Sequence, residues 1–240
     1  MPRQRRLGVV LLDAEHSVET LDWENPDEWL PPSGLGEGFF GHPAAWPLPV
    51  LFAVAHGATA AAAAKSTAEA LDGIAAAVGR LDGRCDLIVG GCGYFGAAWP
   101  LLGSPPSTPT ILSALDLLDL ALSSSRRDAA VLSMSAAAAL SFLGERSDFD
   151  RIRVVGLDHC ADWKAIGRPD WVSNPQWSVE GLEKNLQEVL DVEMQPGGGL
   201  HGVGAVVLEC TVLPQFAALI RDRVGAPVYD LMSIVKAIVG

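Results

Sequence analysis

The sequence has few basic residues and no long uninterrupted apolar run. Its 240 residues include 17 Lys and Arg against 29 Asp and Glu, for a formal net charge of -12. Binding to a phosphate backbone normally requires clustered basic side chains, so we expect no nucleic-acid partner. The apolar region from 44 to 64 is interrupted by Pro47, Pro49 and Gly57. A membrane span needs about 20 consecutive apolar residues, so we expect no membrane anchor.

Cysteine is also scarce, and no two cysteines form a C-x-x-C pair. The four are Cys85, Cys92, Cys160 and Cys210, too few for a disulfide framework. The histidines lack H-E-x-x-H spacing, so no metal site is expected. The basic residues at 3–6 precede an apolar run that Asp13 ends, which is too short for an export signal. These features predict reduced thiols and a soluble, cytoplasmic protein.

What the sequence does contain is a series of short apolar runs, each followed by a turn signal and then a helical pattern. Continuous apolar strands of this kind are typical of a parallel sheet covered on both faces. Helical periodicity is found at 58–78, 115–122 and 179–190. The predicted fold class is therefore α/β. The expected strands are 7–12, 50–55, 86–91, 110–112, 129–133, 153–157, 203–209 and 227–231.

A weak internal repeat predicts two similar halves. Cys92 lies 80 residues after the strand end at Leu12, and Cys210 lies 78 residues after Leu132. We expect two pseudo-symmetric lobes, each a parallel sheet flanked by helices. The first comprises 1–112 plus 212–240 and the second 113–211. Ligands of open α/β sheets bind at the carboxyl ends of strands, so the active site is predicted in the cleft between the lobes.

One region, from 14 to 49, has no sustained periodicity. It contains Trp23, Trp29, Trp46 and the pair Pro31-Pro32. Loops of this length in compact proteins are usually functional or mobile. The region is interpreted either as a lid or as a surface excursion whose aromatic side chains enter the core.

Cys92 and Cys210 each follow a buried strand and precede a turn and helix. A helix N-terminus favours the thiolate, which predicts a lowered thiol pKa. Inverting a carbon centre without a cofactor requires one group to remove a proton and another to add one on the opposite face, and two facing thiols meet that need. Buried cysteines are usually inert packing residues, as we expect for Cys85 and Cys160. The repeated context favours a functional pair.

Four segments carry a resemblance to a known family. The sequence Val207-Leu-Glu-Cys-Thr-Val-Leu-Pro-Gln-Phe, with Pro227-Val-Tyr-Asp-Leu following, is similar to the second-cysteine signature of the aspartate/glutamate racemase superfamily. The segments Gly91-Cys-Gly-Tyr-Phe and Gly41-His-Pro-Ala-Ala-Trp resemble a poorly characterised branch of it. The superfamily includes racemases of aspartate, glutamate and hydantoins, a maleate isomerase and an arylmalonate decarboxylase. The resemblance implies a cofactor-independent enzyme, without pyridoxal phosphate or metal, that holds a small carboxylic acid between Cys92 and Cys210.

The chain also departs from the family pattern. Glutamate racemases follow their first cysteine with Asn and Thr, where this chain has Gly93 and Tyr94. Thr211 matches the residue expected after the second cysteine, but Val212 replaces a common histidine. These changes favour a more apolar pocket for a bulkier or cyclic acid. Retention of both cysteines argues against the decarboxylase, which uses one.

The candidate substrate-binding residues are Asp13, Gly93, Tyr94, Ser133, Ser135 and Thr211. By resemblance, Asp13 assists near the first thiol, and Ser133 and Ser135 donate hydroxyl groups to a carboxylate. Asp and Ser at strand ends more commonly serve as helix caps or turn residues, so both interpretations stay open.

Three alternatives to a racemase accompany this reading. The first is a related isomerase or decarboxylase on the same scaffold. The second is a binding protein without turnover, because a fold does not fix a function. The third is a dehydrogenase, since residues 91–96 fit G-x-G-x-x-G, but the proline-rich stretch at 103–109 shortens the following helix. A symmetric homodimer is the default expectation for assembly.

Overall fold

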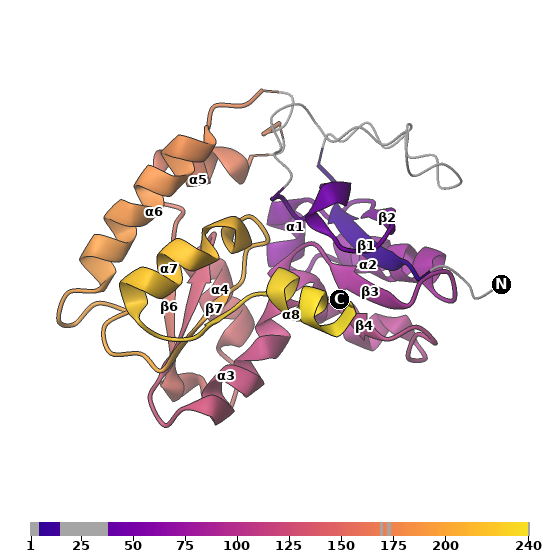
Figure 1. Ribbon diagram of the computed structural model, residues 1–240. Helices are drawn as coiled ribbons and strands as arrows, with labels where there is room; N and C mark the ends of the chain where they lie inside the picture. The colour runs from indigo at the N-terminus through magenta and orange to yellow at the C-terminus, as the bar shows by residue number, and fades with distance from the viewer. Residues whose placement is uncertain (1–4, 15–37, 169, 172–173, 240) are drawn as a thin grey trace.

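The computed structural model describes residues 5–14, 38–168, 170–171 and 174–239. Most of the predicted loop at 14–49, with the interpretation of it as a lid, lies outside the described residues. Two sheets of four parallel strands make up the centre of the fold, and helices flank them (Figure 1). The α/β prediction is confirmed. Among the described residues, no helix has the length and apolar character that crossing a membrane would require.

The two sheets have the same topology. The first has the order β2-β1-β3-β4, and the second has the order β6-β5-β7-β8. In each sheet the first strand along the chain lies between the second and the third. The predicted internal repeat is therefore confirmed at the level of strand order. The first sheet comprises β1 (Leu7–Leu12), β2 (Val50–Ala55), β3 (Leu87–Gly90) and β4 (Thr110–Ile111), and the second comprises β5 (Ala129–Ser133), β6 (Ile152–Gly156), β7 (Ala205–Leu208) and β8 (Val228–Tyr229).

The helices follow the sequence pattern with one correction. The periodic stretch at 58–78 forms two helices, α1 (Ala60–Ala64) and α2 (Ala68–Leu81). Ser66 between them has a φ of 50°, and the Thr67 side chain accepts a hydrogen bond from the Ala70 N–H, which starts α2 anew. The remaining helices are η3 (Pro43–Ala45), η4 (Gly93–Leu102), η5 (Ala114–Leu117), α3 (Leu118–Ser124), α4 (Ala136–Leu143), η6 (Phe149–Arg151), α5 (Ala161–Ile166), α6 (Val179–Glu193), η7 (Leu213–Phe216), α7 (Ala217–Val224) and α8 (Leu231–Val239).

The C-terminal segment does not join the first lobe as a whole, contrary to the predicted boundary at residue 212. Strand β8 pairs in parallel with β7, in the register Val206↔Val228 and Val207↔Tyr229, and so forms the edge of the second sheet. The core of the second lobe also includes the buried side chains of η7 and α7. Only α8 crosses to the first lobe, where Leu231 and Val235 pack in one cluster with Leu7. Figure 1 shows α8 beside β3 and β4.

A shared core fixes the two lobes to each other. One cluster of buried apolar residues combines Val10 and Ile88 of the first sheet with Val131 and Val207 of the second, and α3 contributes Leu118 to it. Burial of several large aliphatic side chains in one cluster stabilises the contact by roughly 1.5–3 kcal/mol for each side chain. The carboxyl ends of β3 and β7 are thereby held at one cleft.

Candidate active site

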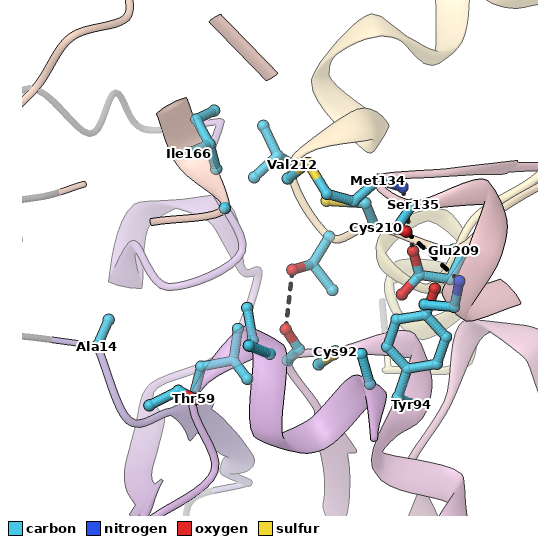
Figure 2. A pocket seen from close by; sticks show the side chains of 18 of the residues that line it. Ala14, Thr59, Cys92, Tyr94, Met134, Ser135, Ile166, Glu209, Cys210 and Val212 are labelled. Atoms are coloured by element: carbon cyan, nitrogen blue, oxygen red, sulfur yellow. Dashed lines mark hydrogen bonds between the residues drawn. The ribbon is translucent and has the colours of Figure 1, made fainter. Parts of the chain in front are cut away.

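Both predicted cysteines line one cavity of about 970 Å³ at the cleft. Cys92 comes two residues after the end of β3, and Cys210 comes two residues after the end of β7, so the two occupy equivalent places in the two sheets. Figure 2 shows them on opposite sides of the pocket. Both are free thiols, and Cys92 is only 8% exposed. The arrangement places two proton-transfer groups around one ligand space.

The thiols are not acidic as the helix-terminus reasoning predicted. Burial and the neighbouring Glu209 raise the pKa of Cys92 well above its usual value. The same two causes raise the pKa of Cys210 to about 12, although the N–H groups of Val212 and Leu213 oppose the shift. The expectation of a lowered pKa is therefore wrong, because desolvation outweighs a few backbone dipoles. Both elements after the thiols, η4 and η7, are 3-10 helices.

Glu209 is the charged group that the sequence reasoning missed. It is 2% exposed and lines the same cavity as the thiols. Its Oε2 accepts hydrogen bonds from the Ser133 hydroxyl at 2.9 Å and from the Met134 N–H at 3.4 Å. Burial raises the pKa of Glu209 to about 7. The signal was present in the sequence, since Glu209 is an acidic residue at the end of an otherwise apolar strand.

Tyr94 links the first lobe to this carboxyl group. Its hydroxyl group lies 3.0 Å from Ser133 Oγ, and the side chain is 4% exposed. Tyr94 also contacts the ring of Phe142 with the centroids 5.6 Å apart. Ser133 is fully buried and is not among the cavity residues, so it lies behind the carboxyl group of Glu209. Figure 2 shows Tyr94 and Glu209 together on one side of the pocket.

Two further contacts join the lobes beside the thiols. Thr211 Oγ1 donates a hydrogen bond to the Gly91 carbonyl oxygen at 2.9 Å. Gly93 lies so close to Glu209 that an added Cβ would come within 2.5 Å of Glu209 Cγ and Oε1. Gly93 does not line the cavity. Its small size is what allows the first-lobe backbone to approach the second-lobe carboxyl group.

Asp13 and Ser135 line the cavity and also have local structural partners. Asp13 Oδ2 accepts a hydrogen bond from the Gly57 N–H at 2.7 Å, and Ser135 caps α4 by accepting one from the Ala138 N–H. Asp13 therefore stabilises a turn and Ser135 caps a helix, which are the common structural roles of such residues at strand ends. Both residues also line the cavity. Cys85 and Cys160 do not line it.

The remaining walls of the cavity are largely apolar. Lys65, Lys164 and Arg168 are the basic side chains among the described lining residues, and Arg168 forms an ion pair with Asp170 at 2.8 Å. The segment 91–96 leads into η4, a 3-10 helix containing Pro100, and not into the α-helix that a dinucleotide fingerprint opens. The structure therefore gives no support to a dinucleotide-binding site, and so to a dehydrogenase, at residues 91–96. The apolar lining residues include Leu11, Phe39, Phe40, Met134, Phe142, Trp163, Ile166 and Trp171.

Comparison with solved structures identifies proteins of similar fold. Allantoin racemase from Pseudomonas fluorescens is 14% identical, with a TM-score of 0.54 over 97% of this chain and 88% of that one. Allantoin racemase from Klebsiella pneumoniae is 18% identical, with a TM-score of 0.53 over 98% and 87%. Aspartate racemase from Picrophilus torridus is 17% identical, with a TM-score of 0.50 over 98% and 92%.

No family model and no curated protein sequence matches the chain. The structural similarity nevertheless shows that the chain has the fold of these proteins, with two parallel sheets flanked by helices. The shared fold extends over nearly the whole length of the chain.

Proposed function

We propose that this protein is a cofactor-independent racemase or isomerase that moves a proton at the carbon next to a carboxylate or a hydantoin-type carbonyl. One observation carries the proposal: two thiols at equivalent strand ends of topologically identical lobes line the same cavity. The substrate carbon between them can lose its proton to one sulfur, as a thiolate, and become a planar carbanion or enolate. That intermediate can then take a proton from the other thiol on the opposite face. Cys92 and Cys210 are the two acid/base groups.

The neighbouring polar groups are proposed to hold the substrate. Ser135, Thr211 and Tyr94 line the cavity together with both thiols. Thr211 directly follows Cys210, and Tyr94 comes two residues after Cys92. Asp13 faces the ligand space from the end of β1, at the position that the resemblance assigns to an assisting acid. Gly93 and Ser133 do not line the cavity but support Glu209, which does. Gly93 leaves room for the Glu209 side chain, and the Ser133 hydroxyl group donates a hydrogen bond to its carboxyl group.

The cavity favours a substrate larger than aspartate. Its volume of about 970 Å³ and its aromatic and aliphatic walls suit an acid or a cyclic amide with an apolar substituent. Of the structures with a similar fold, two are racemases of allantoin, a cyclic amide, and one is a racemase of aspartate, an amino acid. We therefore propose two substrate classes for testing, amino-acid-type acids and hydantoin-type rings.

A heavy-water exchange screen tests the proposal. The purified chain, without added cofactor, is incubated in deuterium oxide with single enantiomers of aspartate, glutamate, aryl-substituted acids, allantoin and other hydantoins. We expect deuterium at the stereogenic carbon of one class, together with loss of optical rotation. Cys92→Ala and Cys210→Ala should each abolish racemisation of that compound, and Cys85→Ala, which changes a thiol outside the cavity, should not. Racemisation at an unchanged rate in either active-site variant would overturn the assignment.

A further inference from the structure

Glu209 occupies a buried site whose hydrogen-bond partners are all neutral. Its backbone N–H donates to the Leu132 carbonyl oxygen at 3.0 Å, which extends the pairing of β5 with β7. Its side chain reaches the first lobe at Gly93. The carboxyl group accepts from the hydroxyl group of Ser133 and from the N–H groups of Met134 and Gly93. A buried carboxylate without a cation is costly, so this group gains a proton easily.

The hydrogen bonds around Ser133 suit both protonation states of the carboxyl group. Ser133 Oγ lies 2.9 Å from Glu209 Oε2, 3.0 Å from Tyr94 Oη and 3.2 Å from the Ser135 carbonyl oxygen. When Glu209 is ionised, Ser133 donates to it and Tyr94 donates to Ser133. When Oε2 carries a proton, Glu209 donates to Ser133, which donates to the Ser135 carbonyl oxygen instead. Only hydrogen atoms need to move between the two arrangements.

The titratable groups facing one another across this site are Glu209, Cys92, Cys210 and Tyr94. The other groups that bear on their protonation are the Ser133 hydroxyl and backbone N–H groups. The negative charge of Glu209 raises the pKa of both thiols, because it disfavours a second negative charge on either sulfur. Like charges buried together do not ionise independently. The site is therefore built to hold one negative charge and to share it among the carboxyl group and the two sulfurs.

We propose that Glu209 is the proton-holding partner of the thiol pair, taking up the proton that leaves Cys92 or Cys210 when one of them becomes a thiolate. In this step an S–H bond breaks and an O–H bond forms on the carboxylate. The net charge of the site does not change, and no further reactant is required. Glu209 acts through the thiols and is a positioning residue. The inference extends the proposed function, but it concerns ionisation of the free protein and does not require a substrate.

The pH profile of thiol alkylation tests this inference. The reduced protein is treated with iodoacetamide across a pH series, and mass spectrometry gives the alkylation rate at Cys92 and at Cys210 separately. In the native chain we expect each rate to rise about tenfold per pH unit up to about pH 7, where Glu209 ionises, and then to level off. In Glu209→Gln the rise should continue, so that alkylation near pH 8 is about tenfold faster than in the native chain.

Two controls separate this role from a structural one. Asp158→Asn removes another carboxylate that lines the same cavity, and its profile should level off like that of the native chain. Infrared spectra of the native chain should show the carbonyl band of a protonated carboxylic acid that persists to about pH 7, a readout that does not depend on a variant folding. Superimposable profiles for the native chain and Glu209→Gln, or loss of that band near pH 4.5, would overturn the inference. Absence of substrate turnover would leave it standing and would count against the proposed function alone.

Discussion

Replacing Glu209 by Gln should change how the stability of the protein depends on pH. The pKa of this group is about 7 in the folded chain, against 4.5 for an ordinary glutamate, because the carboxyl group is buried. Below about pH 4.5 both states bind the proton and the native chain has no penalty. As the pH rises from about 4.5 to about 7, the unfolded state releases the proton while the folded state still holds it, so the free energy of unfolding falls over this range. The full effect of such a shift is about 3 kcal/mol.

Chemical unfolding at two pH values measures this loss. Between about pH 5 and about pH 8 the free energy of unfolding of the native chain should fall by about 2 to 3 kcal/mol more than that of Glu209→Gln. Keeping the upper value below pH 9 limits ionisation of the thiols in the unfolded state. Asp158→Asn, which alters an exposed carboxylate, is the matched control and should follow the native chain. An equal pH dependence in the native chain and Glu209→Gln, or a native chain that gains stability toward pH 8, would refute the reasoning.

Three other substitutions probe the contacts around the thiols. Gly93→Ala should destabilise the fold by about 1 to 3 kcal/mol in urea unfolding, because the added Cβ would overlap Glu209. Gly79→Ala in α2, where an added Cβ meets open space, is the control and should be neutral or slightly stabilising. Equal effects of the two substitutions would contradict the close packing of Gly93 against Glu209. Tyr94→Phe removes the hydroxyl group beside Ser133 and should cost about 1 kcal/mol in the same measurement, with no change expected if that hydrogen bond does not form. Thr211→Val should cost a similar amount, while Thr211→Ser, which keeps the hydroxyl group, should restore stability; failure of Ser to do so would assign the effect to packing.

The sequence was sufficient to predict the sheets because β1, β2, β3, β5 and β7 are mainly apolar runs that are buried along nearly their whole length. The eight expected strands are all present, and the equivalent positions of Cys92 and Cys210 followed from their spacing to the strand ends. The break at Ser66 was hidden, since an alanine-rich stretch has helical periodicity on both sides of it. The placement of β8 was also hidden, because two residues of pairing with β7 leave no distinctive pattern.

The ionisation state of the site was not predictable from local sequence. A cysteine before a helix suggests an acidic thiol, but the pKa of each thiol here depends on burial by both lobes and on Glu209. Likewise, the closeness of Gly93 to Glu209 and the hydrogen bond between Tyr94 and Ser133 join residues far apart in the chain. Such contacts are known only once the two sheets are placed against each other.

Enantiomer-resolved exchange with the single-cysteine variants tests the two-face geometry most directly. Each enantiomer of an active compound is incubated separately in deuterium oxide with Cys92→Ala and with Cys210→Ala, and deuterium incorporation is followed by NMR. Because each remaining thiol reaches one face only, we predict that each variant exchanges one enantiomer without inverting it, and that the two variants select opposite enantiomers. Exchange of the same enantiomer by both variants, or inversion by either of them, would contradict proton transfer by two cysteines from opposite sides.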